Sequence, residues 1–161
     1  MVKSNKLFVG LDPSMRATGI IVLDEDAEIV EQKLFSCKDK ECLIEKELVN
    51  YEKEIEFITN MVGRETVYME GPAYQATGQR ILQMGAIHFL TRLTFFKKNV
   101  EFKVIAPGTL KKFVTGKGNS KKDLMLLKTY KKWGVEFEDD NLCDAYGLAR
   151  MALEDFKNVR N

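Results

Sequence analysis

Residues 7–23 read LFVGLDPSMRATGIIVL. Two apolar runs, 7–11 and 17–23, flank a turn that contains Pro13, and each run has the length and composition of a short strand. A third run, 28–35, alternates apolar and polar residues. Three strands joined by short turns predict an antiparallel meander, with Asp12 at the tip of its first strand.

The remaining segments alternate helices with short strands. Strands are predicted over 66–69 and 102–105, and helices over 40–62, 79–96 and 121–133, with a short helix from 107 and a last one from 139 or 140. Ser120 is expected to cap the helix over 121–133. This order predicts a mixed α/β sheet with helices packed on it, in one domain spanning residues 1–161.

Composition excludes several classes of protein. The chain is 45% hydrophobic and 30% charged, which is ordinary for a globular protein. No apolar run approaches the roughly 20 residues of a membrane helix, and the N-terminus lacks a signal-peptide core, so we expect no membrane partner and a cytoplasmic location. Three cysteines and one histidine suit neither a disulfide framework nor a four-ligand zinc site.

Charge is distributed unevenly along the chain. Residues 24–56 carry 12 Asp or Glu and 5 Lys, whereas residues 110–133 carry 8 Lys and one Asp. The basic segment contains Gly116-Lys117-Gly118 just before a predicted helix, and glycines there give backbone freedom beside a helix N-terminus. It is therefore a candidate phosphate-binding surface, with a solvated helix face as the alternative.

Carboxylates occur at three separate places where one metal site could gather them. Asp12 ends the first strand, Glu70 ends the strand over 66–69, and Asp140 and Asp144 lie in the last helix. Positions four apart, and equally Asn141 and Asp144 three apart, share a helix face. Carboxylates in apolar surroundings are costly to bury without a cation, and Mg²⁺ prefers oxygen ligands. With the basic segment, this predicts metal-dependent cutting of a nucleic-acid backbone.

Four blocks carry a family resemblance: GLDPSMRATG at 10–19, Glu70, LKKFVTGKGNSKK at 110–122 and DNLCDAYGLAR at 140–150. Their order and spacing, over residues 5–156, resemble the RuvC-type Holliday-junction resolvases of the ribonuclease H-like superfamily. The resemblance implies a five-stranded mixed sheet with strand order 3-2-1-4-5, the first three antiparallel, flanked by helices. It also implies a homodimer and Mg²⁺-dependent nicking of paired strands at a four-way junction. The short chain looks like a bacteriophage member, which would act in the host cytoplasm.

Matched to the family pattern, Asp12, Glu70 and Asp144 take the metal-ligand positions, and Lys111 and Lys122 take the two basic positions beside the glycine loop. The chain departs from the pattern at the third carboxylate position, which is Asn141. Asp140 is the preferred additional ligand, and Asn141 is the neutral-oxygen alternative. The aromatic residue that the family inserts at the junction centre is displaced. Tyr74 is the nearest candidate, and a core role is its alternative.

We therefore hypothesise that the protein is a structure-selective DNA endonuclease that acts in DNA recombination and repair. It would use two Mg²⁺ ions per active site, with Mn²⁺ as the alternative ion. Asp12 would bridge both ions, Glu70 and Asp144 would complete their shells, and Asp140 would support one of them. Lys122 would neutralise the scissile phosphate. The DNA backbone would be positioned by further lysines, namely Lys111, Lys112, Lys117 and Lys121.

The predicted helix Gln79–Phe96 is apolar on nearly all sides, which predicts burial on more than one face and makes it the candidate dimer interface. Three other functions stay open. A broader branched-DNA nuclease would cut flaps and forks with the same site. A sugar-kinase or actin-like ATPase shares only the first block. A non-catalytic junction-binding protein would be unaffected by Asp12→Asn.

Overall fold

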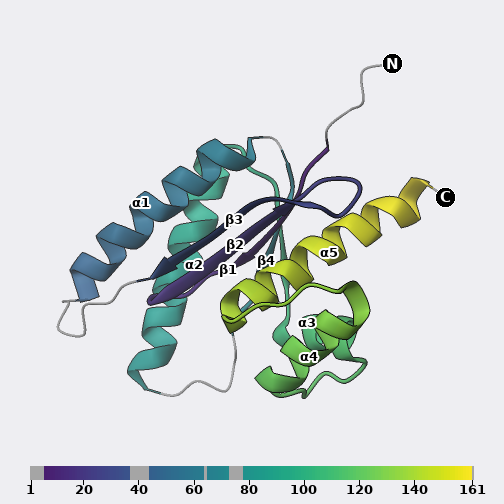
Figure 1. Cartoon of the computed structure of the whole chain (residues 1–161). Coiled ribbons are helices and arrows are strands. Elements are labelled where there is room, and N and C mark those ends of the chain that lie inside the picture. Colours follow the sequence, from purple (N-terminus) through teal and green to yellow (C-terminus); the bar gives the residue numbers. More distant parts are fainter. Residues whose placement is uncertain (1–5, 37–43, 64, 73–77, 161) are drawn as a thin grey trace.

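A computed structural model describes residues 6–36, 44–63, 65–72 and 78–160. Its elements follow the predicted order along the chain (Figure 1). They are β1 (Phe8–Asp12), β2 (Ala17–Leu23), β3 (Ile29–Ser36), α1 (Ile44–Val62), β4 (Val67–Glu70), α2 (Gln79–Lys97), β5 (Phe102–Ile105), α3 (Pro107–Thr115), α4 (Lys122–Trp133) and α5 (Asp140–Arg160).

The five strands form one mixed sheet in the order β3-β2-β1-β4-β5. β2 pairs antiparallel with both β1 and β3, whereas β4 pairs parallel with β1 and with β5. The predicted meander and the strand order are therefore confirmed. Parallel pairing of β1 with β4 brings the C-terminal ends of both strands to the same edge of the sheet.

Helices cover the two faces of this sheet (Figure 1). α1 and α2 pack on one face, where a core forms around Tyr51, Ile55 and Phe95. α5 lies along the other face with α3 and α4 beside it, around a second core that includes Leu110 and Tyr146. The central strands are buried on both sides, which explains why β1 is apolar up to Leu11 and why β2 is apolar from Ile20 to Leu23.

Side-chain alternation decides which face receives the strand-terminal carboxylates. In β1, Val9 and Leu11 belong to the core beneath α1 and α2, whereas Phe8 belongs to the core beneath α5. Successive side chains point to opposite faces of a sheet, so Asp12 lies on the face of Phe8. In β4 the same rule places Glu70 with Tyr68, again on the face covered by α5.

Two glycines allow α5 to lie directly on this face. A Cβ atom at Gly10 of β1 would come within 1.9 Å of the Ala145 carbonyl oxygen, and one at Gly19 of β2 within 2.5 Å of the Asn141 carbonyl oxygen. Any side chain at either position would therefore push the helix away from the sheet. Because Asp144 precedes Ala145, this close approach also sets the height of Asp144 above the sheet edge.

Among the described residues, one predicted helix cap differs in the structure; the predicted helix start at residue 40 lies outside the described residues. α4 begins at Lys122, and the Ser120 hydroxyl does not cap it. Ser120 instead shares a hydrogen bond with the Thr115 hydroxyl (2.6 Å) and donates one to the Lys117 carbonyl (2.8 Å). The expected cap was wrong because the loop offers this hydroxyl nearer partners. At α5, an Asp139 carboxylate oxygen accepts the backbone N–H groups of residues 141 and 142.

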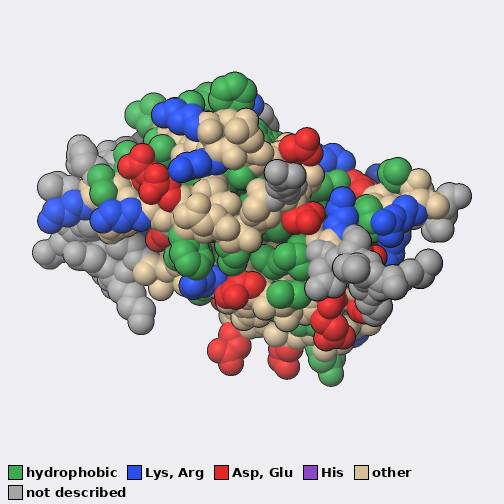
Figure 2. Space-filling view, turned by 90° about the horizontal axis from the view of Figure 1, so that it is seen from above, with side chains coloured by type: hydrophobic (Ala, Val, Ile, Leu, Met, Phe, Trp, Pro, Cys, Tyr) green, Lys and Arg blue, Asp and Glu red, His purple; other side chains and the backbone are tan. Residues whose placement is uncertain are grey.

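The outer surface mixes side chains of both signs. Figure 2 shows acidic, basic and hydrophobic side chains interspersed on the face seen from above Figure 1. In the described part of the chain, no helix is long and apolar enough to cross a membrane.

Candidate active site

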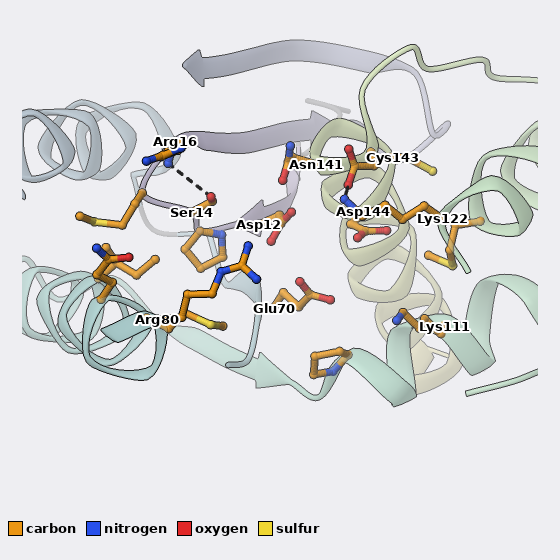
Figure 3. Close-up of a pocket in the computed structure, with 18 of the residues that line it drawn as sticks. Asp12, Ser14, Arg16, Glu70, Arg80, Lys111, Lys122, Asn141, Cys143 and Asp144 are labelled. Atoms are coloured by element: carbon orange, nitrogen blue, oxygen red, sulfur yellow. Dashed lines mark hydrogen bonds and ion pairs between the residues drawn. The ribbon is translucent and has the colours of Figure 1, made fainter. Parts of the chain in front are cut away.

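Three carboxylates meet where β1 and β4 end beneath α5. Asp12, Glu70 and Asp144 each present an oxygen within 4.8 Å of the others (Figure 3). Asp12 is buried, with 8% of its surface exposed, and the other two are half-buried. Residues 58 and 74 positions apart in the sequence are thus brought into the spacing that a shared cation requires.

These carboxylates disfavour ionisation because they are partly buried and lie close together, and Lys111 and Lys122 offset this only in part at Glu70 and Asp144. Burial, followed by repulsion from Glu70 and Asp144, raises the pKa of Asp12 well above its usual value. Burial also raises the pKa of Glu70. The pKa of Asp144 rises to about 7 because of burial and the nearby charges of Glu70 and Asp140. A bound cation would lower all three pKa values, so three carboxylates at this spacing fit a divalent metal.

Asp140 lies apart from this group of three. It forms an ion pair with Lys122, and both side chains line the same cleft as the carboxylates. The hydrogen bond to Asp140 is the main cause of a raised pKa at Lys122. Asn141 also lines the cleft, and its side-chain amide donates a 3.0 Å hydrogen bond to Asp139. Which of the two supplies a further ligand stays a prediction.

The carboxylates form the floor of a cleft of about 900 Å³. Lys111 from α3 and Lys122 from α4 flank it on one side (Figure 3), and both interact electrostatically with Glu70 and Asp144. The cleft is therefore anionic at its floor and cationic along this wall. A phosphate group bridging the two would contact a floor-bound cation and the lysines together.

The other predicted DNA-binding residues are placed differently. Among the described residues, Lys112, Lys117 and Lys121 are exposed and do not line the cleft, although Lys112 and Lys121 each adjoin in the chain a lysine that does. Tyr74 lies outside the described residues. The loop that carries Lys117 is held by Thr115, whose hydroxyl donates to the Lys111 carbonyl (2.8 Å) and accepts from the Lys117 N–H (3.1 Å). Gly116 supplies the left-handed backbone (φ 84°) that this turn needs.

Sequence reasoning missed one wall of the cleft. Arg80, Gln83, Met84 and Ile87 of α2 line it, as does Arg16 of the β1–β2 turn. The α2 residues follow the i, i+3, i+4, i+7 spacing of a single helix face. Every helix position belongs to such a set, and the apolar residues all around this helix leave no pattern in the sequence that marks this face.

Sequence comparison gives no family: no family model matches the chain, and no curated protein matches it.

Solved structures do match. RuvC of Thermus thermophilus in complex with a Holliday junction substrate is similar at 16% identity and a TM-score of 0.76, covering 96% of this chain and 95% of that one. The yeast mitochondrial Holliday junction resolvase is similar at 15% identity and a TM-score of 0.63, and the match covers 94% of this chain and 81% of that one. The Fowlpox virus resolvase in complex with its substrate Holliday junction DNA is similar at 12% identity and a TM-score of 0.58. The match covers 93% of this chain and 98% of that one.

This chain therefore has the fold of the RuvC-type resolvases, and the fold predicted from the sequence motifs is confirmed. The predicted bacteriophage origin is not addressed by these similarities.

Proposed function

We propose that this chain is a structure-selective DNA endonuclease that resolves four-way junctions by paired symmetric nicks. One observation carries the proposal: carboxylates from β1, β4 and α5 converge in a cleft whose wall holds Lys111 and Lys122. The fold supports it, since similar structures include resolvases complexed with Holliday junction DNA.

The proposed cofactor is a pair of Mg²⁺ ions, with Mn²⁺ as the alternative. Asp12, Glu70 and Asp144 would hold them, with Asp140 as a further ligand once its pairing with Lys122 is exchanged. Bound ions of this kind supply activation of water and charge stabilisation at the departing oxygen. The chain's own part is to hold the carboxylates in place, and α5 does this for Asp144 by packing on Gly10 and Gly19.

The lysines have two proposed roles. Lys122 lines the cleft, where it pairs with Asp140, and from this position it would neutralise charge at the scissile phosphate. Lys111 would hold an adjacent phosphate from the same wall. Lys112, Lys117 and Lys121 are exposed and do not line the cleft, and they would bind the DNA backbone without reading its sequence.

Two symmetric cuts require two active sites, so the proposed form is a homodimer. The outer face of α2 supports this interface. Its exposed apolar side chains recur at helical spacing, with 74% of Leu82, 71% of Phe89 and 79% of Phe96 exposed. Phe89→Glu should therefore shift the sedimenting species from twice the chain mass to the chain mass. If Phe89→Glu still sedimented at twice the chain mass, the dimer interface would lie elsewhere.

Cleavage of a synthetic four-way junction, a flap, a fork and linear duplex tests the proposal, with and without Mg²⁺. Wild type is compared with Asp12→Asn, and Asp26→Asn in the exposed turn after β2 serves as the matched control. We expect Mg²⁺-dependent cleavage of the junction by wild type and control, and binding without cleavage by Asp12→Asn. Equal cutting of flaps and forks would show a broader branched-DNA nuclease. Junction binding with no cleavage by any variant would show a binding protein.

A further inference from the structure

The first turns of α2 form a second wall of the cleft, opposite the lysines of α3 and α4 (Figure 3). Arg80, Gln83, Met84 and Ile87 all line the cleft from this helix. This face is distinct from the exposed apolar stripe on the same helix. One helix therefore presents an outer apolar face and, in its first turns, a polar and cationic face directed toward the carboxylates.

Arg80 is the charged residue that α2 contributes to the lining of the cleft. Its side chain is exposed and is directed toward Asp12 and Glu70 in Figure 3. Within the described part of the chain it forms no ion pair with an acidic residue. Its guanidinium therefore faces the carboxylate cluster, and no acidic side chain of the described residues pairs with it.

The position of Arg80 within α2 has no evident structural benefit. The N-terminus of a helix carries partial positive charge, so acidic residues are favoured in the first turn and a cation there is unfavourable. The first turn of α2 contains Arg80 and no acidic residue. Helix dipole and side chain thus add to a positive field at the cleft mouth, which suits an anion bound in the cleft.

We propose that Arg80 binds a phosphate of the cleaved strand next to the scissile phosphate, so that this strand is held between two cationic walls. This inference rests on the proposed nuclease function and specifies how its site holds DNA. A guanidinium can bind two phosphate oxygens at once and so fixes orientation as well as position. Gln83, one turn further on, offers an uncharged donor beside it.

Holding both sides of the cut would position the reacting phosphate over the floor carboxylates. Lys111 and Lys122 fix the strand from one wall, and Arg80 fixes it from the other. Met84, which is half-buried, adds apolar surface to the second wall, and such surface suits the faces of sugars and bases. The main effect of Arg80 is therefore expected on the cleavage rate, with a smaller effect on overall junction affinity.

The test couples Arg80 to individual phosphates. Single-turnover cleavage rates are measured for wild type, Arg80→Gln and Arg80→Lys on junctions that carry one neutral methylphosphonate at each position around the cut. Arg92→Ala is the matched control, since Arg92 is exposed on the same helix and lies outside the cleft lining. Unfolding midpoints are recorded for every variant, and we expect that of Arg80→Gln to be no lower than wild type, because Arg80 is exposed and a cation in the first turn is unfavourable.

On the unmodified junction, Arg80→Gln should reduce the cleavage rate by about 10-fold to 100-fold, the range for a charge-assisted hydrogen bond. At one phosphate next to the cut, the methylphosphonate should slow wild type similarly and slow Arg80→Gln no further. Arg80→Lys should recover part of the rate, and Arg92→Ala should match wild type.

Two results would separate the failure of this inference from failure of the proposed function. If wild type cuts the junction and the effects of Arg80→Gln and the methylphosphonate are additive at every position, Arg80 binds no single phosphate and the inference is overturned. If wild type cuts no junction at all, the proposed function fails first, and the Arg80 inference fails with it.

Discussion

Replacing Asp144 by Asn in the metal-free protein should change the free energy of unfolding by an amount that depends on pH. Burial, together with Glu70 and Asp140, raises the pKa of Asp144 from 3.8 to about 7. The folded state therefore binds this proton more tightly than the unfolded state does. The resulting stabilisation is complete below about pH 4 and is lost as the pH rises through about 7.

The magnitude follows from the difference in pKa. A pKa difference of about 3 between the folded and unfolded states corresponds to about 4 kcal/mol of unfolding free energy. Because the proton is released progressively between the two pKa values, about 3 kcal/mol of this stabilisation is lost when the pH is raised from about 5 to about 8. Asn has no proton to release, so over that interval wild type should lose about 3 kcal/mol relative to Asp144→Asn. At the higher pH, Asp144→Asn should be the more stable protein.

Urea unfolding in the presence of a chelator measures this difference. The fluorescence of Trp133 reports it, because this single tryptophan packs edge-on against Tyr146 in the core beneath α5. Asp26→Asn is the control. A stability difference between wild type and Asp144→Asn that is the same at both pH values would refute the claim that folding raises the pKa of Asp144.

Added Mg²⁺ extends the same experiment. Wild type should gain about 1.4 kcal/mol at about ten times the dissociation constant of the ion. Asp144→Asn should gain less, because it has lost a ligand. Equal gains in the two proteins would place the ion away from this cluster.

Two further predictions concern packing and catalysis. Gly10→Ala should destabilise the protein by about 3 kcal/mol or more in urea unfolding, because its Cβ would meet the Ala145 carbonyl oxygen at 1.9 Å. Gly85→Ala, whose Cβ would have no neighbour within 4 Å, should instead stabilise α2 by about 1 kcal/mol; destabilisation by both would contradict the close-approach argument. Lys122→Ala should lower the junction cleavage rate about 100-fold while affinity changes little. Lys128→Ala, exposed on the same helix outside the cleft, should leave the rate unchanged, and equal losses would show a general charge effect.

The strands and the floor of the cleft could be predicted because they follow from local patterns. Apolar runs of strand length located β1, β2 and β4, and period-two alternation located β3. The positions of Asp12 and Glu70 at strand ends then followed from the chain itself. Asp144 could be proposed because helical spacing places it one turn inside α5, beyond the capping positions where acidic residues are common.

Other features depend on tertiary placement. Gly10 and Gly19 are visible in the sequence, but their purpose depends on how closely α5 approaches the sheet. Ser120 has the composition of a helix cap, yet the Thr115 hydroxyl competes successfully for it. Arg80 was overlooked because nothing local in the sequence indicates that the start of α2 faces the ends of β1 and β4.

The most direct test of the central claim is to map the nicks on a four-way junction, with each of the four strands labelled in turn and Mg²⁺ present. The account predicts nicks at matching positions in two opposing strands, which a DNA ligase reseals, and none with Asp12→Asn. Nicks confined to one strand, or cleavage of linear duplex at a comparable rate, would contradict it.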